Sequence, residues 1–149
     1  MSLVTITNNM FNGASSFNRD INKWDVSKVV QMVNFFRGAA SFNQELSSWD
    51  VSKVTNMDGM FRDATAFNKD ISAWKFNVNV NLTSFMGGKS NYNPIFYDRL
   101  LQNLANKDWT ARTRSKVLDM GTNKYTAAGV AHRATLVSKG WTITDGGLV

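Results

Sequence analysis

The sequence predicts an α/β solenoid in which short parallel strands form one face and short helices form the other. The chain resembles itself at a fixed spacing of 25 residues, and self-similarity at a period of roughly 20 to 50 residues is typical of stacked-repeat proteins. Within one unit, from Trp49 to Trp74, the apolar rhythm changes from two residues to three or four. Such a change indicates a strand followed by a helix.

Large apolar residues mark the repeat most clearly. Three columns recur at the spacing of 25: Trp24, Trp49 and Trp74; Phe17, Phe42, Phe67 and Tyr92; Met10, Phe35, Met60 and Phe85. Aromatic side chains at repeat positions usually supply buried area between neighbouring units. We therefore expect the tryptophans to lie in the core, although an exposed aromatic track for sugars or bases is the alternative.

Each unit divides into a strand half and a helical half. Trp49 and Val51 are two residues apart, which indicates a strand with Asp50 on the opposite face. The apolar residues between Val54 and Phe67 recur at spacings of three and four, which indicates a short helix. Strands are expected near 24–26, 49–51, 74–76, 117–120 and 141–144, with a partial strand near Val4. The strand half also fits the leucine-rich-repeat template, so the predicted fold is a leucine-rich-repeat-like right-handed solenoid.

The C-terminal region departs from the period, and we expect it to form an α/β cap. Asn93 and Pro94 are typical of a helix start, and apolar spacing extends this helix to about Asn106. A second helix is expected from Tyr125 to Lys139, before Gly140. We therefore divide the chain into a repeat array over 1–93, with a truncated first copy, and a capping region of the same domain over 94–149.

Composition excludes several classes of chemistry. The 149 residues contain no cysteine, which removes disulfides, thiol catalysis and Cys-ligated zinc. The net charge is +6, and residues 95–149 hold eight Lys and Arg against four Asp and Glu. No paired acids, glycine-rich phosphate loop or nucleophile motif appears. We expect no enzyme, no cofactor and no metal site, with no catalytic residue to name, and no membrane span in this chain.

Two polar columns have structural interpretations. We expect Asn18, Asn43, Asn68 and Asn93 to bond the backbone of the adjacent unit. The acidic column of Asp20, Glu45 and Asp70 is expected to be surface charge, with calcium binding as the alternative.

The basic residues before the predicted strand at 117–120 alternate along the sequence. Arg112, Arg114 and Lys116 should therefore point to one side. We interpret them as solvated charge on the cap, with attraction of phosphate or an acidic surface as the alternative. A nucleic-acid interface would need a larger basic face with exposed aromatics. No nucleic-acid partner is expected.

The outward positions of the predicted strands form the candidate ligand face. Extended repeat surfaces commonly bind partners, although small polar side chains also suit a solvated surface. The candidate residues are Lys23, Asp25, Ser27, Ser48, Asp50, Ser52, Lys75 and Asn77.

The recurring motif Phe-Asn-x-Asp-Ile-Ser-x-Trp-Asp-Val-Ser-x-Val-x-x-Met-x-x-Met-Phe resembles the bacterial surface protein 26-residue repeat, known from Mycoplasma-type lipoproteins and grouped with BspA-like leucine-rich repeats. The resemblance covers residues 10–93. It implies an extracellular or cell-surface protein that acts in adhesion, recognising a protein or glycan of a host or a neighbouring cell. It supplies no catalytic or cofactor residues.

Two further expectations follow. A passive stalk or spacer of a surface protein is the alternative function. The chain opens inside a repeat unit and has no secretory signal, so we interpret it as a fragment of a longer array. Its exposed N-terminal repeat is predicted to allow a homodimer.

Overall fold

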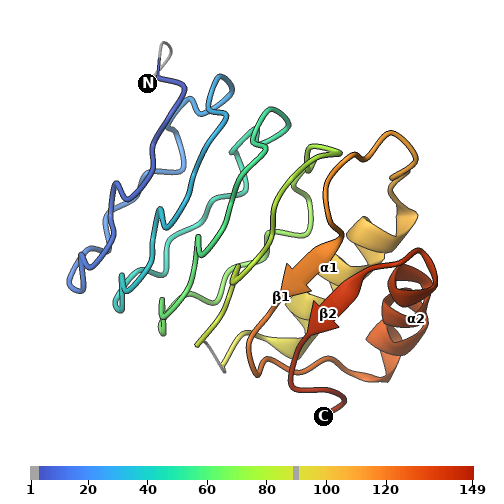
Figure 1. Cartoon of the computed structure of the whole chain (residues 1–149). Helices are drawn as coiled ribbons and strands as arrows, with labels where there is room; N and C mark the ends of the chain where they lie inside the picture. The colour runs from blue at the N-terminus through green and yellow to red at the C-terminus, as the bar shows by residue number, and fades with distance from the viewer. Residues whose placement is uncertain (1–3, 89–90) are drawn as a thin grey trace.

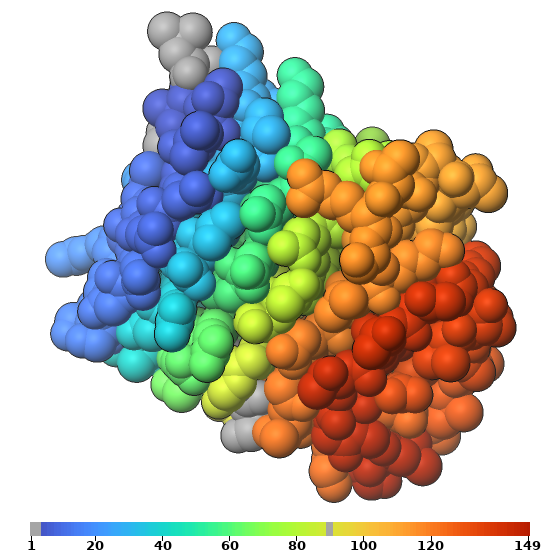
Figure 2. Space-filling view, in the orientation of Figure 1, coloured from blue at the N-terminus to red at the C-terminus, as the bar shows by residue number. Residues whose placement is uncertain are grey.

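A computed structural model describes residues 4–88 and 91–149 of the chain. The regular elements lie in the C-terminal part: α1 (Pro94–Asn106), β1 (Val117–Asp119), the 3₁₀ helix η1 (Ala127–Gly129), α2 (Val130–Ser138) and β2 (Thr142–Thr144). The strands β1 and β2 pair in parallel, with Leu118 opposite Ile143. Successive segments of the N-terminal part run side by side toward these elements, as Figures 1 and 2 show.

The predicted leucine-rich-repeat-like solenoid is wrong. The described residues form a small α/β fold with two α-helices and one two-stranded parallel sheet, without a strand at 24–26, 49–51 or 74–76 and without a helix at 54–67. The expected strands at 117–120 and 141–144 are confirmed as β1 and β2. Near Val4, the structure has only an isolated bridge, from Ile6 to Gln31.

Backbone conformation explains why no helix forms between Val54 and Phe67. Gly59 and Asp63 have φ angles of 63° and 58°, in the left-handed region that a right-handed helix cannot contain. Both conformations recur 25 residues earlier, at Asn34 and Gly38, with φ angles of 52° and 66°. The apolar spacing of three therefore comes from consecutive turns.

Between Met57 and Asp63, every second backbone N–H donates to a carbonyl of the neighbouring segment and not to one within its own segment. Met57, Gly59, Phe61 and Asp63 donate to the carbonyls of Asn81, Thr83, Phe85 and Gly87 at 2.9 to 3.0 Å. The residues between them bond locally, as when Met60 donates to the Met57 carbonyl at 3.1 Å. Isolated parallel bridges join Gln31 to Asn56 and Asn56 to Asn81, and Leu82 pairs with Leu118 of β1. The N-terminal segments and the sheet are thus hydrogen-bonded to one another.

The core consists of apolar columns between these segments. Trp49 and Trp74 stack at 6.5 Å and are 3% and 2% exposed, which confirms the predicted core position of these two. Trp24 is half-buried. Phe42 and Phe67 stack at 6.0 Å in the next column. Stacked rings of this kind contribute buried area and favourable ring geometry together.

The asparagine column behaves as the sequence predicts. Asn43, Asn68 and Asn93 each donate the backbone N–H to the side-chain oxygen of the asparagine 25 residues earlier, at 2.8 to 2.9 Å. Asn93 also caps α1 by accepting from the Ile95 N–H at 2.9 Å. The column therefore satisfies turn backbone groups and starts the first helix.

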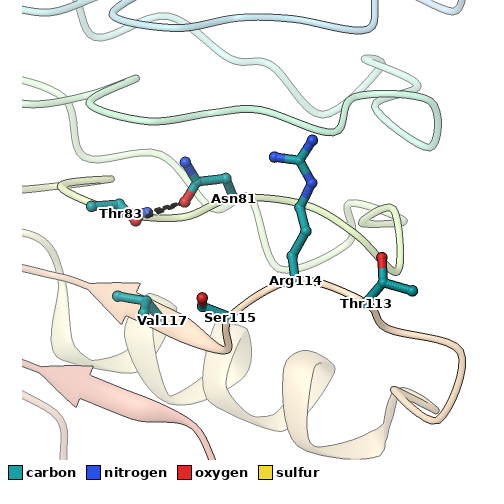
Figure 3. Close-up of a pocket in the computed structure, with 6 residues that line it drawn as sticks. All are labelled: Asn81, Thr83, Thr113, Arg114, Ser115 and Val117. Atoms are coloured by element: carbon teal, nitrogen blue, oxygen red, sulfur yellow. Dashed lines mark hydrogen bonds between the residues drawn. The ribbon is translucent and has the colours of Figure 1, made fainter.

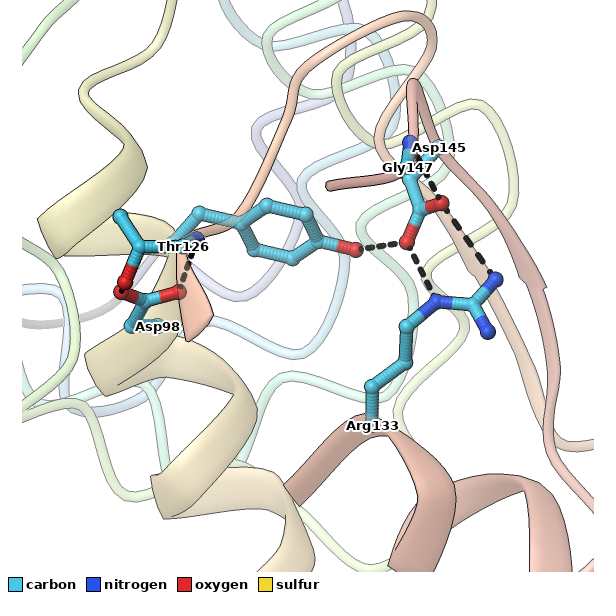
Figure 4. A network of polar contacts seen from close by, with 6 residues as sticks. Asp98, Thr126, Arg133, Asp145 and Gly147 are labelled. Carbon is cyan, nitrogen blue, oxygen red and sulfur yellow. Dashed lines mark hydrogen bonds and ion pairs between the residues drawn. The ribbon is translucent and has the colours of Figure 1, made fainter. Parts of the chain in front are cut away.

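Two carboxylates hold the C-terminal elements together (Figure 4). Asp98 on α1 accepts hydrogen bonds from the Thr126 hydroxyl and backbone N–H, just before η1. Asp145, whose side chain is 3% exposed, pairs with Arg133 of α2 at 2.8 Å. Asp145 also accepts from the Tyr97 hydroxyl at 2.8 Å. The segment after β2 is therefore fixed to both α-helices.

The expected second helix, Tyr125 to Lys139, is present as η1 followed by α2, and Gly140 follows it with φ of 83°. Neither α-helix, nor any other helix among the described residues, has the length and apolar character to cross a lipid bilayer.

Candidate functional site

A row of side-chain-capped turns replaces the strands that were expected to carry the candidate ligand face. Asp25 accepts from the Ser27 N–H at 3.1 Å and from the Ser27 hydroxyl at 2.6 Å. Asp50 accepts from the Ser52 N–H at 3.0 Å. In the next segment Lys75 stands at the position of Asp50, and a turn of the same kind begins two residues later, where Asn77 accepts from the Asn79 N–H at 2.9 Å. An Asp or Asn side chain that bonds the backbone two residues on fixes a turn, which explains why no strand forms there.

The turns stabilise the charged form of both acids. The pKa of Asp50 is lowered below its usual value by the Ser52 hydroxyl and N–H, and further by the charges of Lys75 and Lys53. The pKa of Asp25 is lowered in the same way by Ser27. Both side chains are exposed. Two carboxylates with fixed orientation are therefore presented to solvent at neutral pH.

Four of the eight predicted face residues line one hollow. Ser48, Asp50, Ser52 and Lys75 surround a space of about 450 Å³ together with Ser47, Trp49 and Ala73. Lys75 comes from the segment that follows the one carrying Asp50, so the hollow spans two segments. Lys75 also lines an adjoining hollow of about 490 Å³, which reaches Asn103 and Lys107 at the end of α1.

The other four predicted residues have different places. Lys23, Asp25 and Ser27 belong to the preceding segment and do not line this hollow. Asn77 is half-buried, and its side-chain amide donates to the Ser52 carbonyl at 2.9 Å, so it holds two segments together. The structure thus reduces the candidate ligand face to a centre made by Ser48, Asp50, Ser52 and Lys75.

The scaffold beneath this centre is rigidly connected. Trp49 is among the residues that line the hollow, and its buried ring stacks on the Trp74 ring with an interplanar angle of 6°. The Ser48 N–H donates to the Asn22 side chain at 3.0 Å, which joins the hollow to the preceding segment. Polar groups supported in this way keep their orientation without a ligand, which lowers the entropic cost of binding.

The chemistry of the hollow is that of hydrogen bonding and weak charge. It offers serine hydroxyls, one carboxylate and one ammonium group, a set that suits sugar hydroxyls or polar peptide groups. Within residues 4–88 and 91–149, no group of three or more His, Cys, Asp or Glu side chains is placed to hold a metal ion.

A further hollow, which the sequence did not indicate, lies where the N-terminal segments meet β1. Asn81, Thr83, Thr113, Arg114, Ser115 and Val117 line a space of about 390 Å³. In Figure 3 the Arg114 side chain extends from the loop before β1 toward the segment that carries Asn81. These residues meet because Leu82 pairs with Leu118 across more than 30 residues of chain. No local sequence motif records that pairing.

The basic residues 112, 114 and 116 were expected to share one side, and the structure separates them. Arg112 donates to the Val78 and Val80 carbonyls at 2.7 and 2.8 Å, with its guanidinium over Trp109 and Trp141. Arg114 lines the hollow described above, whereas Lys116 lines a different one. Arg112 is therefore a structural residue, and the three do not form a single basic stripe.

The fold and this site define a small α/β protein whose side-by-side segments present a polar surface hollow. The family model for Mycoplasma protein of unknown function, DUF285, matches residues 1–96. This is well over half of the chain, and the protein belongs to that family. Neither a curated protein nor a solved structure matches the chain.

Proposed function

We propose that the chain is a non-catalytic binding module of a bacterial cell-surface or secreted protein, acting in adhesion or recognition. Its ligand is a protein or glycan of a host or a neighbouring cell. One observation carries the proposal: Ser48, Asp50, Ser52 and Lys75 converge on a hollow of about 450 Å³ across two segments. Serine hydroxyls, a carboxylate and an ammonium group form a surface that selects polar ligands by hydrogen-bond geometry.

The surface location rests on sequence resemblance. The recurring Trp-Asp-Val-Ser motif resembles the 26-residue repeat of bacterial surface proteins, and the family described for Mycoplasma is compatible with it. An extracellular or cell-surface location is therefore part of the proposal.

A passive stalk or spacer is the second candidate function. Continuous hydrogen bonding between segments, such as Phe36 N–H to the Met60 carbonyl at 2.8 Å, favours it. Stacked aromatic columns add stiffness along the same direction. A stalk needs this connectivity but no surface hollow.

The homodimer through the N-terminal repeat stays a prediction. The first described segment exposes Ile6 by 58% and Met10 by 40%, and its Phe11 is only half-buried. Sedimentation velocity over a wide concentration range tests it. Association that Ile6→Ser weakens supports the homodimer, and a monomer at all concentrations removes it.

Adhesion of cells that display the full-length protein distinguishes a binding module from a stalk. We expect Asp50→Ala and Lys75→Ala each to reduce adhesion to extracellular matrix or host cells several-fold at unchanged surface display. Glu45→Ala and Lys124→Ala are the matched controls, because both side chains are exposed and lie outside the hollow. If adhesion persists in Asp50→Ala and Lys75→Ala, the module binds elsewhere or acts as a spacer.

A further inference from the structure

Three lysines from distant positions converge on one small hollow at the C-terminal end of the molecule. Lys107 follows α1, Lys116 precedes β1, and Lys139 follows α2. Together with Asp108, Trp109 and Thr110 they line a space of about 200 Å³. Because the three come from different elements, the tertiary fold creates this concentration of positive charge.

Backbone carbonyls hold two of the ammonium groups in place. Lys116 Nζ donates to the Lys139 carbonyl at 2.6 Å, and Lys139 Nζ donates to the Ala105 carbonyl at 2.7 Å. Lys107 Nζ lies 5.5 Å from the centre of the Trp109 ring. An ammonium group has three donors, so Lys116 and Lys139 each keep two for a ligand. None of the three forms an ion pair with a carboxylate of the described part of the chain.

One carboxylate lines the same hollow, and it leaves the charge positive. Asp108 accepts from the Thr110 N–H at 2.9 Å. Hydrogen bonds from Thr110 lower the pKa of Asp108, and the charges of Lys139 and Lys107 lower it further. The charges of Lys139 and Lys107 therefore lie close enough to Asp108 to stabilise its carboxylate. With three ammonium groups against one carboxylate, the hollow has an unmatched positive charge that an anion would neutralise.

We propose that this hollow binds a phosphate group. Lysine binds oxyanions as a compact point charge, whereas planar carboxylates are matched best by the fork of arginine. Lysines from three different segments of the chain line the hollow, and such a set suits a tetrahedral oxyanion, which has acceptors in several directions. The buried Trp109, 4% exposed, forms part of a stable wall.

The hollow also adjoins the proposed ligand face. Lys107 lines both this space and the hollow shared by Lys75 and Asn103. A phosphorylated ligand could therefore occupy both surfaces, but phosphate binding at the three lysines does not rest on the proposed function.

Titration of the whole chain with sodium phosphate at pH 7 and constant ionic strength tests the site. The readout is the ¹H–¹⁵N signal of the Trp109 indole, which donates to the Leu104 carbonyl at 2.8 Å beside the hollow. We expect a saturable shift that sodium chloride does not reproduce. Parallel titrations with glycerol phosphate and O-phosphoserine distinguish free phosphate from a phosphate ester as the preferred source.

Variants that change one charge at the hollow should shift phosphate affinity in opposite directions. Lys107→Gln should weaken phosphate binding roughly three- to tenfold, and Asp108→Asn should tighten it by a similar factor, because each changes one charge near the anion. Lys53→Gln removes one exposed positive charge elsewhere and should have no effect. The proposal is overturned if phosphate gives no saturable shift, if Asp108→Asn binds no tighter, or if Lys53→Gln weakens binding as much as Lys107→Gln.

Discussion

Trp74 donates its indole N–H to the backbone carbonyl of Leu46, 28 residues earlier, at 3.0 Å. Trp49 makes the same bond to the Ile21 carbonyl at 3.1 Å. Both bonds are buried, so each tryptophan fills the core and also joins two segments. Among the described residues, no carbonyl accepts the indole N–H of the half-buried Trp24.

Replacing the indole tests this second role. Trp74→Phe keeps an aromatic ring but removes one of the two donors to the buried Leu46 carbonyl, which also accepts from the Trp49 N–H at 3.1 Å. The lost hydrogen bond should cost about 1 kcal/mol of unfolding free energy. Trp24→Phe is the matched control and should cost less, because it breaks no such bond. Urea unfolding measures both variants. Equal losses would show that the indole bond adds nothing.

The asparagine column predicts a difference between two substitutions at one position. Asn68 accepts from the Asn93 N–H at 2.8 Å, beside the start of α1. Asn68→Ala removes the acceptor and should lower stability by about 1 kcal/mol or more. Asn68→Asp keeps an oxygen there and should recover much of the loss in thermal unfolding. An alanine variant as stable as wild type would contradict this role.

Left-handed backbone positions predict opposite effects for two reciprocal substitutions. At Gly59, φ is 63° and an added Cβ would lie 2.4 Å from Asn34 Oδ1. Gly59→Ala should therefore cost about 2 kcal/mol or more. Ser84 occupies the same position in the next segment with φ of 50°, so Ser84→Gly should be neutral or stabilising. Guanidinium unfolding compares them, and a tolerated Gly59→Ala would argue against the turn conformation.

Acid titration tests the capped turn at Asp50. Because its folded pKa lies below the ordinary 3.8, its stabilising contribution is complete above that value and is lost as pH falls through the lowered folded pKa. Asn77, two positions past the equivalent of Asp50 in the next segment, shows that a neutral amide can cap a turn of this kind. The wild type should therefore be more stable than Asp50→Asn at pH 6, and the difference in unfolding free energy between them should shrink as the pH falls toward 3. A difference independent of pH would contradict the assignment.

The buried pair in the C-terminal part should matter more than a surface pair. Asp145→Ala leaves Arg133 and the Tyr97 hydroxyl without their shared acceptor, which should cost about 3 kcal/mol. The Arg62–Asp63 pair at 3.7 Å is about half-exposed, so Arg62→Ala should change stability by about 0.5 kcal/mol or less. Differential scanning calorimetry can rank the two, and similar losses would contradict this account.

The sequence predicts the C-terminal elements well because their signals are local. Asn93 and Pro94 start α1, and Gly140 follows α2, as expected from capping preferences. Among the described residues before residue 89, the predicted helices are absent because consecutive turns there place apolar residues inward at a spacing close to that of a helix. The recurring Gly13, Gly38 and Gly88 were the available signal of left-handed turns.

The candidate site was only partly predictable. Alternation around Trp49 correctly indicated that Ser48, Asp50 and Ser52 lie outward, although a capped turn rather than a strand places them there. Lys75 joins them because positions 25 residues apart lie side by side. The hollow at Arg114 and the three-lysine hollow depend on tertiary pairings, such as Leu82 with Leu118, that no spacing in the sequence encodes.

A binding screen of the chain against immobilised glycans and extracellular proteins tests the central claim most directly. The account predicts that at least one ligand binds the wild type and that Asp50→Ala combined with Lys75→Ala loses most of the signal. The equally charged control, Glu45→Ala with Lys124→Ala, should keep it. Binding that survives Asp50→Ala with Lys75→Ala, or a screen in which the wild type binds nothing, would contradict recognition through this hollow.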